Sequence, residues 1–393
     1  MVGWGRTPVV PVDGALRLFT PHMLAAPVVQ TVLERAGVAP AQVDAVVLGN
    51  ALGAGGNPAR MVALAAGLPD ACAALTVDTQ CCAGLDAIAI ACGLLASGQA
   101  SVVVAGGVEA WSRAPIRQHR PIRQGEAAQA YTRPAFAPDP ARDPDLLAAA
   151  ARCAEDHGIS RSAQDAYALQ SHARALAALS GATAEIVPVG GVRADSYPRA
   201  VRPGRAARMP PLMPSAPGAR TDCQISTLGV SPRADGAAVV VLATPAAAQY
   251  LGLRTDMQWV ASASLGCAPE MPLLGAALAA RECLKRGGFA HPDDAIAALA
   301  AIELHDAFAV QGLAFCQNLG LHPDRINRRG GGLARGHPIG ASGAIALVRL
   351  LVELDQACVA ESEQGQLLGL AAIAGAGGLG AAVLVRRQCT RTL

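Results

Sequence analysis

The chain has 393 residues, too many for one ordinary hydrophobic core, so its length favours two domains of similar size or a duplicated pair. Its formal net charge is +2, which excludes a strong overall field for nucleic acid, and aromatic residues make up only 3%. Many small apolar residues pack helices and strands closely, as in a layered α/β protein.

The eleven cysteines are scattered and odd in number, and most lie in apolar segments, which predicts reduced thiols in a cytoplasmic protein. Cysteine and histidine spacings indicate no metal site, and the first residues contain no apolar signal-peptide core. Two uncharged runs, 87–108 and 367–385, are interrupted by glycines or a polar turn. We interpret them as buried elements, and we expect no membrane, nucleic-acid or metal partner.

In chain order, the first third predicts a helix over about 20–36 and a strand over 46–49. The glycine-rich loop 49–60 lacks the Lys and Ser/Thr of a phosphate-binding P-loop, so we assign it a structural role. A helix over about 83–97 and a strand over 101–106 follow. These alternating elements predict one α/β half.

Cys81 lies in a small-residue turn just before the helix 83–97. The partial positive charge of a helix start favours thiolate, so the position predicts a lowered pKa for this thiol. Taken alone, a cysteine at a helix start is more often a small core residue.

Prolines and arginines dominate the segment from about 115 to 220, where only 162–179 is clearly helical. We interpret this segment as an inserted domain. Its basic residues are candidates for contacts with phosphate groups, although arginines of solvated loops look the same. They are Arg117, His119, Arg120, Arg123, Arg193, Arg199, Arg202, Arg205 and Arg208.

The last third repeats the plan of the first, with strands and helices in similar order and a helix from about 342 to 354. The predicted elements are strands 239–243, 258–265, 299–304, 367–374 and 380–386 and helices 273–286 and 307–319. A single His337 stands between Gly336 and Pro338 just before the helix 342–354, so its imidazole is held in a fixed turn. A plain strand-to-helix turn would have the same residues.

Three motifs in this order carry a resemblance: Cys81-Cys-Ala-Gly-Leu-Asp-Ala87, Val102-Val-Val-Ala-Gly-Gly-Val-Glu109 and Gly336-His-Pro-Ile-Gly-Ala-Ser-Gly343. The chain resembles the thiolase family of acyl-CoA acyltransferases. The resemblance implies a five-layered αβαβα fold of two similar halves. We expect residues 1–115 with 221–248 to form the first half, 116–220 an inserted loop domain on the CoA side, and 249–393 the second half.

The resemblance also implies roles for site residues. Cys81 would be the nucleophile and His337 the base that activates it. The sequence His305-Asp-Ala-Phe308 is similar to that of sterol-carrier-protein-type thiolases, and Cys with two His is similar to the elongating 3-ketoacyl-ACP synthases. Cys81, His305, His337 and the backbone of Ala376 would stabilise an oxyanion. Expected substrate contacts are Ser231, Phe308, Gly336 and Gly377.

The chain departs from its family at Ala374, where thiolases have a second catalytic cysteine that removes an α-proton. Asp143-Pro-Asp145 replaces the usual Met-Gly of the inserted domain. Three alternatives follow: a thiolase-like acyltransferase working through Cys81, a condensing enzyme that decarboxylates or simply transfers the acyl group, and a catalytically reduced acyl-CoA-binding subunit.

The expected substrate is an acyl-CoA or acyl-carrier thioester, with no other cofactor. Met271, Leu273 and Leu274 are candidates for limiting the acyl chain. Family members are dimers or tetramers, so we expect a homodimer or homotetramer, and the apolar central strands before Ala105 are a candidate interface.

Overall fold

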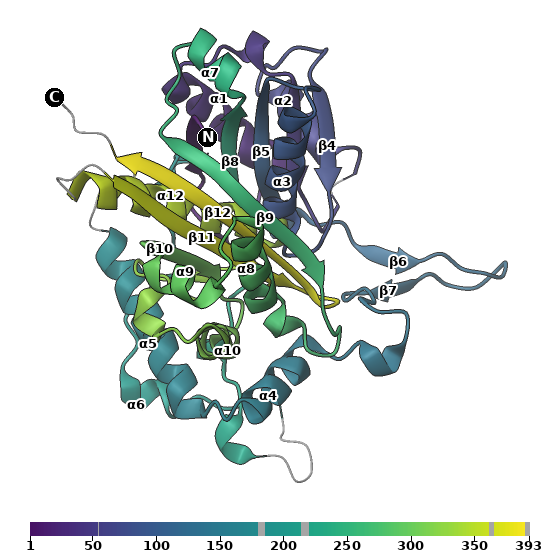
Figure 1. Ribbon diagram of the computed structural model, residues 1–393. Helices are drawn as coiled ribbons and strands as arrows, with labels where there is room; N and C mark the ends of the chain where they lie inside the picture. Colours follow the sequence, from purple (N-terminus) through teal and green to yellow (C-terminus); the bar gives the residue numbers. More distant parts are fainter. Residues whose placement is uncertain (54, 180–184, 214–219, 361–364, 390–393) are drawn as a thin grey trace.

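The structure is a computed structural model that describes residues 1–53, 55–179, 185–213, 220–360 and 365–389 (Figure 1). The first sheet has strand order β1-β8-β5-β3-β4, with β2 paired to β8. Strand β3 is parallel to β4 and β5, whereas β8 is antiparallel to β5. The strands are β1 (Gly3–Arg6), β2 (Val10–Pro11), β3 (Ala45–Gly49), β4 (Ala73–Val77), β5 (Val102–Ala110) and β8 (Ala234–Ala243).

Side chains of β5 alternate between two apolar clusters, because successive residues of a strand point to opposite faces of its sheet. Val102, Val104 and Val108 pack with α1 (Pro21–Ala36) and α2 (Pro58–Ala65). Val103 and Ala105 pack with α3 (Ala83–Ala96). The first sheet is therefore covered by helices on both faces.

The second sheet has strand order β10-β11-β12-β9, with β10 parallel to β11 and the other pairs antiparallel. Its outer face packs against α8 (Gly275–Arg286) and α10 (Ala309–Leu319), and its inner face packs against α12 (Ser342–Ala360). The strands are β9 (Met257–Gly266), β10 (Ala301–His305), β11 (Gly365–Gly375) and β12 (Leu379–Cys389), and α9 (Pro292–Ala298) precedes β10.

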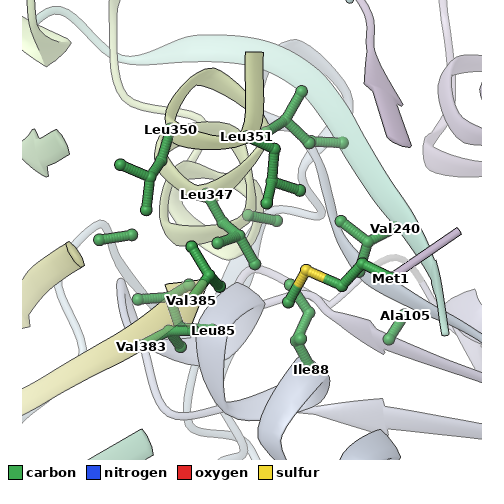
Figure 2. Packing of buried hydrophobic residues seen from close by; sticks show 14 of the residues in the cluster. Met1, Leu85, Ile88, Ala105, Val240, Leu347, Leu350, Leu351, Val383 and Val385 are labelled. Atoms are coloured by element: carbon green, nitrogen blue, oxygen red, sulfur yellow. The ribbon is translucent and has the colours of Figure 1, made fainter. Parts of the chain in front are cut away.

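Helices α3 and α12 share the layer between the two sheets. Figure 2 shows Leu85 and Ile88 of α3, Leu347 and Leu351 of α12 and Val383 of β12, which lies next to Leu85, in one apolar cluster. All five are buried. The fold is thus the predicted αβαβα arrangement, and it brings the starts of the two middle helices together.

Residues 116–220 contain more helix than the single stretch that the sequence predicted. A missed helix, α4 (Leu146–Asp156), begins where the Asp145 side chain accepts a hydrogen bond from the Leu147 N–H at 2.8 Å. An acidic side chain at this place satisfies a free N–H of the first turn. The other elements are β6 (Arg117–His119), β7 (Gln129–Tyr131), α5 (Arg161–Leu179) and α6 (Pro203–Ala206). Residues 180–184 and 214–219 of the expected inserted domain lie outside the described residues.

Two further expectations need correction. Strands β5 and β3 lie inside the first sheet, so of the apolar strands before Ala105 these two offer no free edge to a second subunit. Cys358 of α12 and Cys389 of β12 form a disulfide, so the prediction that the cysteines are reduced is wrong for this pair. In the described ranges, no helix has both the length and the apolar character needed to cross a membrane.

Candidate active site

Cys81 lies just before α3, in a turn where Gln80 adopts a left-handed conformation (φ 54°). Burial raises the pKa of its thiol to about 11, although the backbone N–H groups of Ala376 and of Cys81 itself act in the opposite direction. The sequence predicted a lowered pKa, and this sign is wrong because loss of water disfavours the thiolate more than the helix start favours it. The thiol is therefore protonated at neutral pH.

His337 meets this thiol from the other half of the chain: its Nε2 lies 3.1 Å from Cys81 Sγ. Its Nδ1 lies 2.7 Å from Ser342 Oγ, and that hydroxyl donates its own proton to the Pro338 carbonyl at 3.0 Å. Ser342 can therefore only accept from His337, so the imidazole carries its proton on Nδ1. Nε2 is left with a lone pair directed at the thiol, as a general base requires.

Burial lowers the pKa of His337 to about 4, so the imidazole is neutral as well as correctly oriented. The resting pair is thus a neutral thiol beside a neutral base. Any attack of this sulfur on a substrate would therefore require proton transfer from the thiol to the imidazole.

The turn that follows His337 is anchored to the first half by buried Glu109, at the end of β5. Its carboxylate accepts hydrogen bonds from the Gly340 N–H at 3.0 Å, the Ala51 N–H at 2.9 Å and Asn50 Nδ2 at 2.8 Å. A Cβ on Gly107 would lie 1.9 Å from the Gly340 oxygen, so only glycine permits this close approach of the two backbones. Gly107 of the motif 102–109 and Gly340 of the motif 336–343 therefore help to position His337.

His305 lies at the end of β10 and stacks on His337, with ring centroids 4.4 Å apart. Burial, with the charges of His337 and Arg335, lowers its pKa well below the ordinary value. Its Nε2 is buried without a hydrogen-bond partner among the described residues. A buried polar atom without a partner is a place where a water or a ligand oxygen binds. The adjacent Asp306 accepts from the Tyr167 hydroxyl at 2.8 Å, which holds this corner in place.

A cavity of about 230 Å³ opens onto the thiol and the base. Its wall contains Cys81, His337, Ser231 and Phe308, and Ala376 lines it next to Ala374. Here the Ser231 hydroxyl is engaged, since it donates to the Gly332 carbonyl at 2.7 Å. No charged carboxylate lies in this wall, which belongs entirely to the described residues.

Several expected residues lie outside the cavity wall. His305 is behind His337, and Gly336 (φ 120°) packs against Ala234 and the Pro232 carbonyl. Gly377 (φ 79°) faces the backbone of Phe136. Of the three residues proposed to limit the acyl chain, only Leu273 lines the cavity. Gly336 and Gly377 therefore shape the backbone around the cavity.

The structure adds residues that sequence reasoning missed, namely Trp111, Phe136, Arg233 and Gln311 in the cavity wall and Ser342 behind His337. Ser342 and Glu109 stood inside the quoted motifs, so their positions carried a usable signal. Trp111 begins a short 3₁₀ helix directly after β5 and Phe136 lies in an irregular segment, and only the fold brings both to the cavity.

In comparisons with known proteins, two family models together match nearly the whole chain. The thiolase N-terminal domain matches residues 1–246, and the thiolase C-terminal domain matches residues 253–387. The chain belongs to the thiolase family. A putative acetyl-CoA C-acetyltransferase of Bacillus subtilis is 36% identical over 376 residues, which cover 95% of this chain and 94% of the relative.

Other thiolase-family relatives agree. An acetyl-CoA acetyltransferase of Cupriavidus necator is 34% identical, with 99% of each chain covered. The crystal structure of the Bacillus anthracis acetyl-CoA acetyltransferase has a TM-score of 0.86 and 31% identity, and covers 98% of both chains. This chain is therefore a thiolase-superfamily acyltransferase.

Proposed function

We propose that this thiolase-family enzyme takes an acyl group from an acyl-CoA thioester onto Cys81 and passes it to a second acceptor. The observation that carries the proposal is the 3.1 Å contact between Cys81 Sγ and the unprotonated Nε2 of His337. A thiol that faces a correctly oriented neutral base, at the wall of a cavity, is the arrangement that thioester exchange needs. The names of the relatives support acetyl-CoA as a donor.

In the first step, His337 Nε2 accepts the proton of Cys81 while Sγ forms a bond with the thioester carbonyl carbon. The developing oxyanion takes hydrogen bonds from the backbone N–H groups of Cys81 and Ala376, both of which already point at the sulfur. The bond from carbon to the CoA sulfur then breaks, and CoA leaves with the proton from His337. Cys81 keeps the acyl group until the acceptor attacks.

A decarboxylative or plain acyl-transfer reaction is the second candidate, and Ala374 favours it. Ala374 lines the cavity, and its methyl group cannot accept a proton. By the resemblance, thiolases would have their proton-removing cysteine at this position. Loss of CO₂ generates the carbanion without such a base. His305 supports this candidate, because two stacked histidines with one cysteine resemble the set of the elongating 3-ketoacyl-ACP synthases, which condense decarboxylatively. The similarity of His305-Asp-Ala-Phe308 to sterol-carrier-type thiolases supports the first candidate instead.

The remaining expectations belong to the same proposal. Ser231 and Phe308 line the cavity and would contact the substrate, while 116–220 would act as the inserted domain. The cytoplasm is the location expected from the sequence. A homodimer or homotetramer fits a chain whose edge strand, β4, leaves Leu75 42% exposed. Nearby Met61 and Leu64 of α2 are each 45% exposed. An unpaired apolar strand edge is suited to a second copy, and light scattering of wild type and Leu75→Lys would test this.

The test of the reaction is the intact mass of the enzyme after incubation with acetyl-CoA, acetoacetyl-CoA or malonyl-CoA. We expect an acyl adduct and free CoA with wild type, and neither with Cys81→Ala. Cys82→Ala is the matched control, since this neighbouring thiol is buried and directed at the Ile373 carbonyl. An adduct that persists in Cys81→Ala would contradict the proposal, and the absence of any adduct in wild type would favour a binding subunit.

A further inference from the structure

The wall of the catalytic cavity contains one side chain with a permanent charge, Arg233, and all of the lining residues are described. The rest of the wall is apolar or uncharged apart from the reacting pair. Arg233 is also its one exposed residue, so the guanidinium lies where the cavity meets solvent. The acylation chemistry proposed for Cys81 and His337 gives this cation no role.

Arg233 lacks a countercharge. Its guanidinium lies over the ring of Trp111, 4.9 Å from the centroid, and forms no ion pair with any described carboxylate. The nearby Asp235 is engaged by the Ser112 N–H at 2.8 Å and the Ser112 hydroxyl at 2.6 Å. The ring orients the guanidinium but cannot neutralise it.

A second arginine provides the contrast. Arg133 stacks in the same way on Phe136, another residue of the cavity wall, at 5.0 Å. Its charge is neutralised by Asp143, which accepts two hydrogen bonds from the guanidinium. Two arginines thus rest on aromatic rings of one cavity, and only Arg233 is left to pair with something that enters.

The backbone of Arg233 is fixed beside the base. Arg233 forms a parallel bridge with His337, the His337 N–H donates to the Pro232 carbonyl at 2.7 Å, and the Val12 N–H donates to the Arg233 carbonyl at 2.9 Å. Neighbouring strands lie about 4.8 Å apart, so this cation starts within one side-chain length of the reacting atoms. The CoA phosphates lie many bonds from the thioester, at the far end of the pantetheine arm.

We propose that Arg233 selects acyl groups that carry a free carboxylate, so that the preferred donors are monothioesters of dicarboxylic acids. The inference rests on the proposed acylation of Cys81 and names its substrate class. The guanidinium would pair with the carboxylate at the end of the acyl chain, through bidentate charge-assisted hydrogen bonds. The apolar wall would accommodate the methylene groups between this carboxylate and the thioester.

The experiment compares succinyl-CoA with butyryl-CoA, which have equal chain lengths and differ in the terminal carboxylate. Acylation rates of Cys81 are followed by CoA release and intact mass in wild type, Arg233→Met and Arg233→Lys. Arg113→Met is the matched control, because this exposed arginine lies two residues beyond Trp111 and outside the cavity wall. We expect wild type to prefer succinyl-CoA by about tenfold in kcat/KM. The preference should vanish in Arg233→Met, survive in part in Arg233→Lys and remain in Arg113→Met.

Two results would overturn the inference: no preference in wild type, or equal losses for both donors in Arg233→Met. In the second case, succinyl-pantetheine and butyryl-pantetheine, which lack phosphates, would be insensitive to the substitution, and the arginine would serve the CoA phosphate groups. Failure of the proposed function itself looks different, since neither these donors nor acetyl-CoA would then acylate Cys81 in any variant.

Discussion

Helices α3 and α12 occupy corresponding places in the two halves of the chain. Each lies in the middle layer, follows a tight turn and packs on the sheet of its own half. The turn before α3 carries a thiol, Cys81, and the turn before α12 carries a base, His337, held by Ser342. Under the proposed mechanism neither half could activate a thioester alone, and Cys81 meets His337 only because the fold stacks the two sheets around both helices.

The two halves also differ in the number of residues that they supply to the candidate site. The first half supplies one reacting side chain and the anchor Glu109, whereas the second supplies His337, His305 and the strand end with Ala374 and Ala376. The strand end carries Ala374, whose methyl group cannot accept a proton. Substitutions in the second half should therefore separate activation of the thiol from removal of an α-proton.

Replacing the proposed base, His337, should cause the largest change in the rate of acylation. In His337→Ala, Cys81 keeps its raised pKa but has no proton acceptor, so the rate of acylation should fall by about 10²- to 10⁴-fold. Stopped-flow release of CoA in a single turnover measures this step. His305→Ala is the comparison, since His305 makes no contact with the thiol, and an equal loss in both variants would argue against distinct roles.

Introducing a thiol at the strand end should have a smaller effect, and on a different step, the removal of an α-proton. Ala374 is 9% exposed and shares the cavity wall with Cys81, so the side chain of Ala374→Cys would face the bound acyl group. A thiol at this place can accept an α-proton, and we expect exchange of the acetyl methyl protons with deuterium to rise by about a hundredfold.

The measurement is NMR of acetyl-CoA incubated in D₂O with a reductant present, and Ala374→Ser is the control for side-chain size. If wild type already exchanges these protons at the rate of Ala374→Cys, another base serves the reaction and the decarboxylative candidate loses its support.

The sequence alone predicted the layers, Cys81 and His337, because motif order and the alternation of strands and helices depend on local patterns. It missed α4, since Asp145 was interpreted as a departure from the family and its capping role was overlooked. The disulfide of Cys358 and Cys389 was missed because it joins the ends of two elements 31 residues apart, and only the packing of α12 on the second sheet brings them together.

The pKa of Cys81 shows why local patterns are insufficient for the site. A helix start is visible in the sequence, but the opposing desolvation comes from the other half of the chain. Arg233 was overlooked for the same reason: its lack of a countercharge is a property of the assembled cavity. The pairing of Cys81 with His337 was predictable, whereas the protonation of the pair and the unpaired charge of Arg233 were not.

The pH dependence of acylation should show whether His337 is a buried, neutral base. At acidic pH an ordinary histidine would lose about tenfold in kcat/KM, and the buried one would not. Burial lowers the pKa of His337 to about 4, so the neutral base persists to that pH. At pH 5.5 an ordinary imidazole would be about 90% protonated and kcat/KM would fall about tenfold. We expect less than a twofold fall.

The lowered pKa of His337 also makes the stability of the folded protein depend on pH. Between pH 6.5 and about 4 the unfolded chain binds a proton that folded His337 does not, so the free energy of unfolding decreases as the pH falls through this window. Enzyme returned to pH 7 must recover full activity for the kinetic profile to count. An acid limb near pH 6.5 in the recovered enzyme would contradict a buried, neutral base.

The smallest expected effect concerns the orientation of the base. In Ser342→Ala, Nδ1 of His337 loses its hydrogen-bond acceptor, and the tautomer with the proton on Nε2 becomes available. That tautomer presents a proton to Cys81 where a lone pair is needed. A neutral hydrogen bond is worth about 1 kcal/mol, so the acylation rate should fall about fivefold, with little change in KM.

Ser342→Thr keeps the hydroxyl and should retain most of the rate. Thermal unfolding of both variants separates the effect on the rate from any loss of stability caused by the missing contact with the Pro338 carbonyl. An unchanged rate in Ser342→Ala would mean that the stacked His305, and not Ser342, sets the orientation of the base.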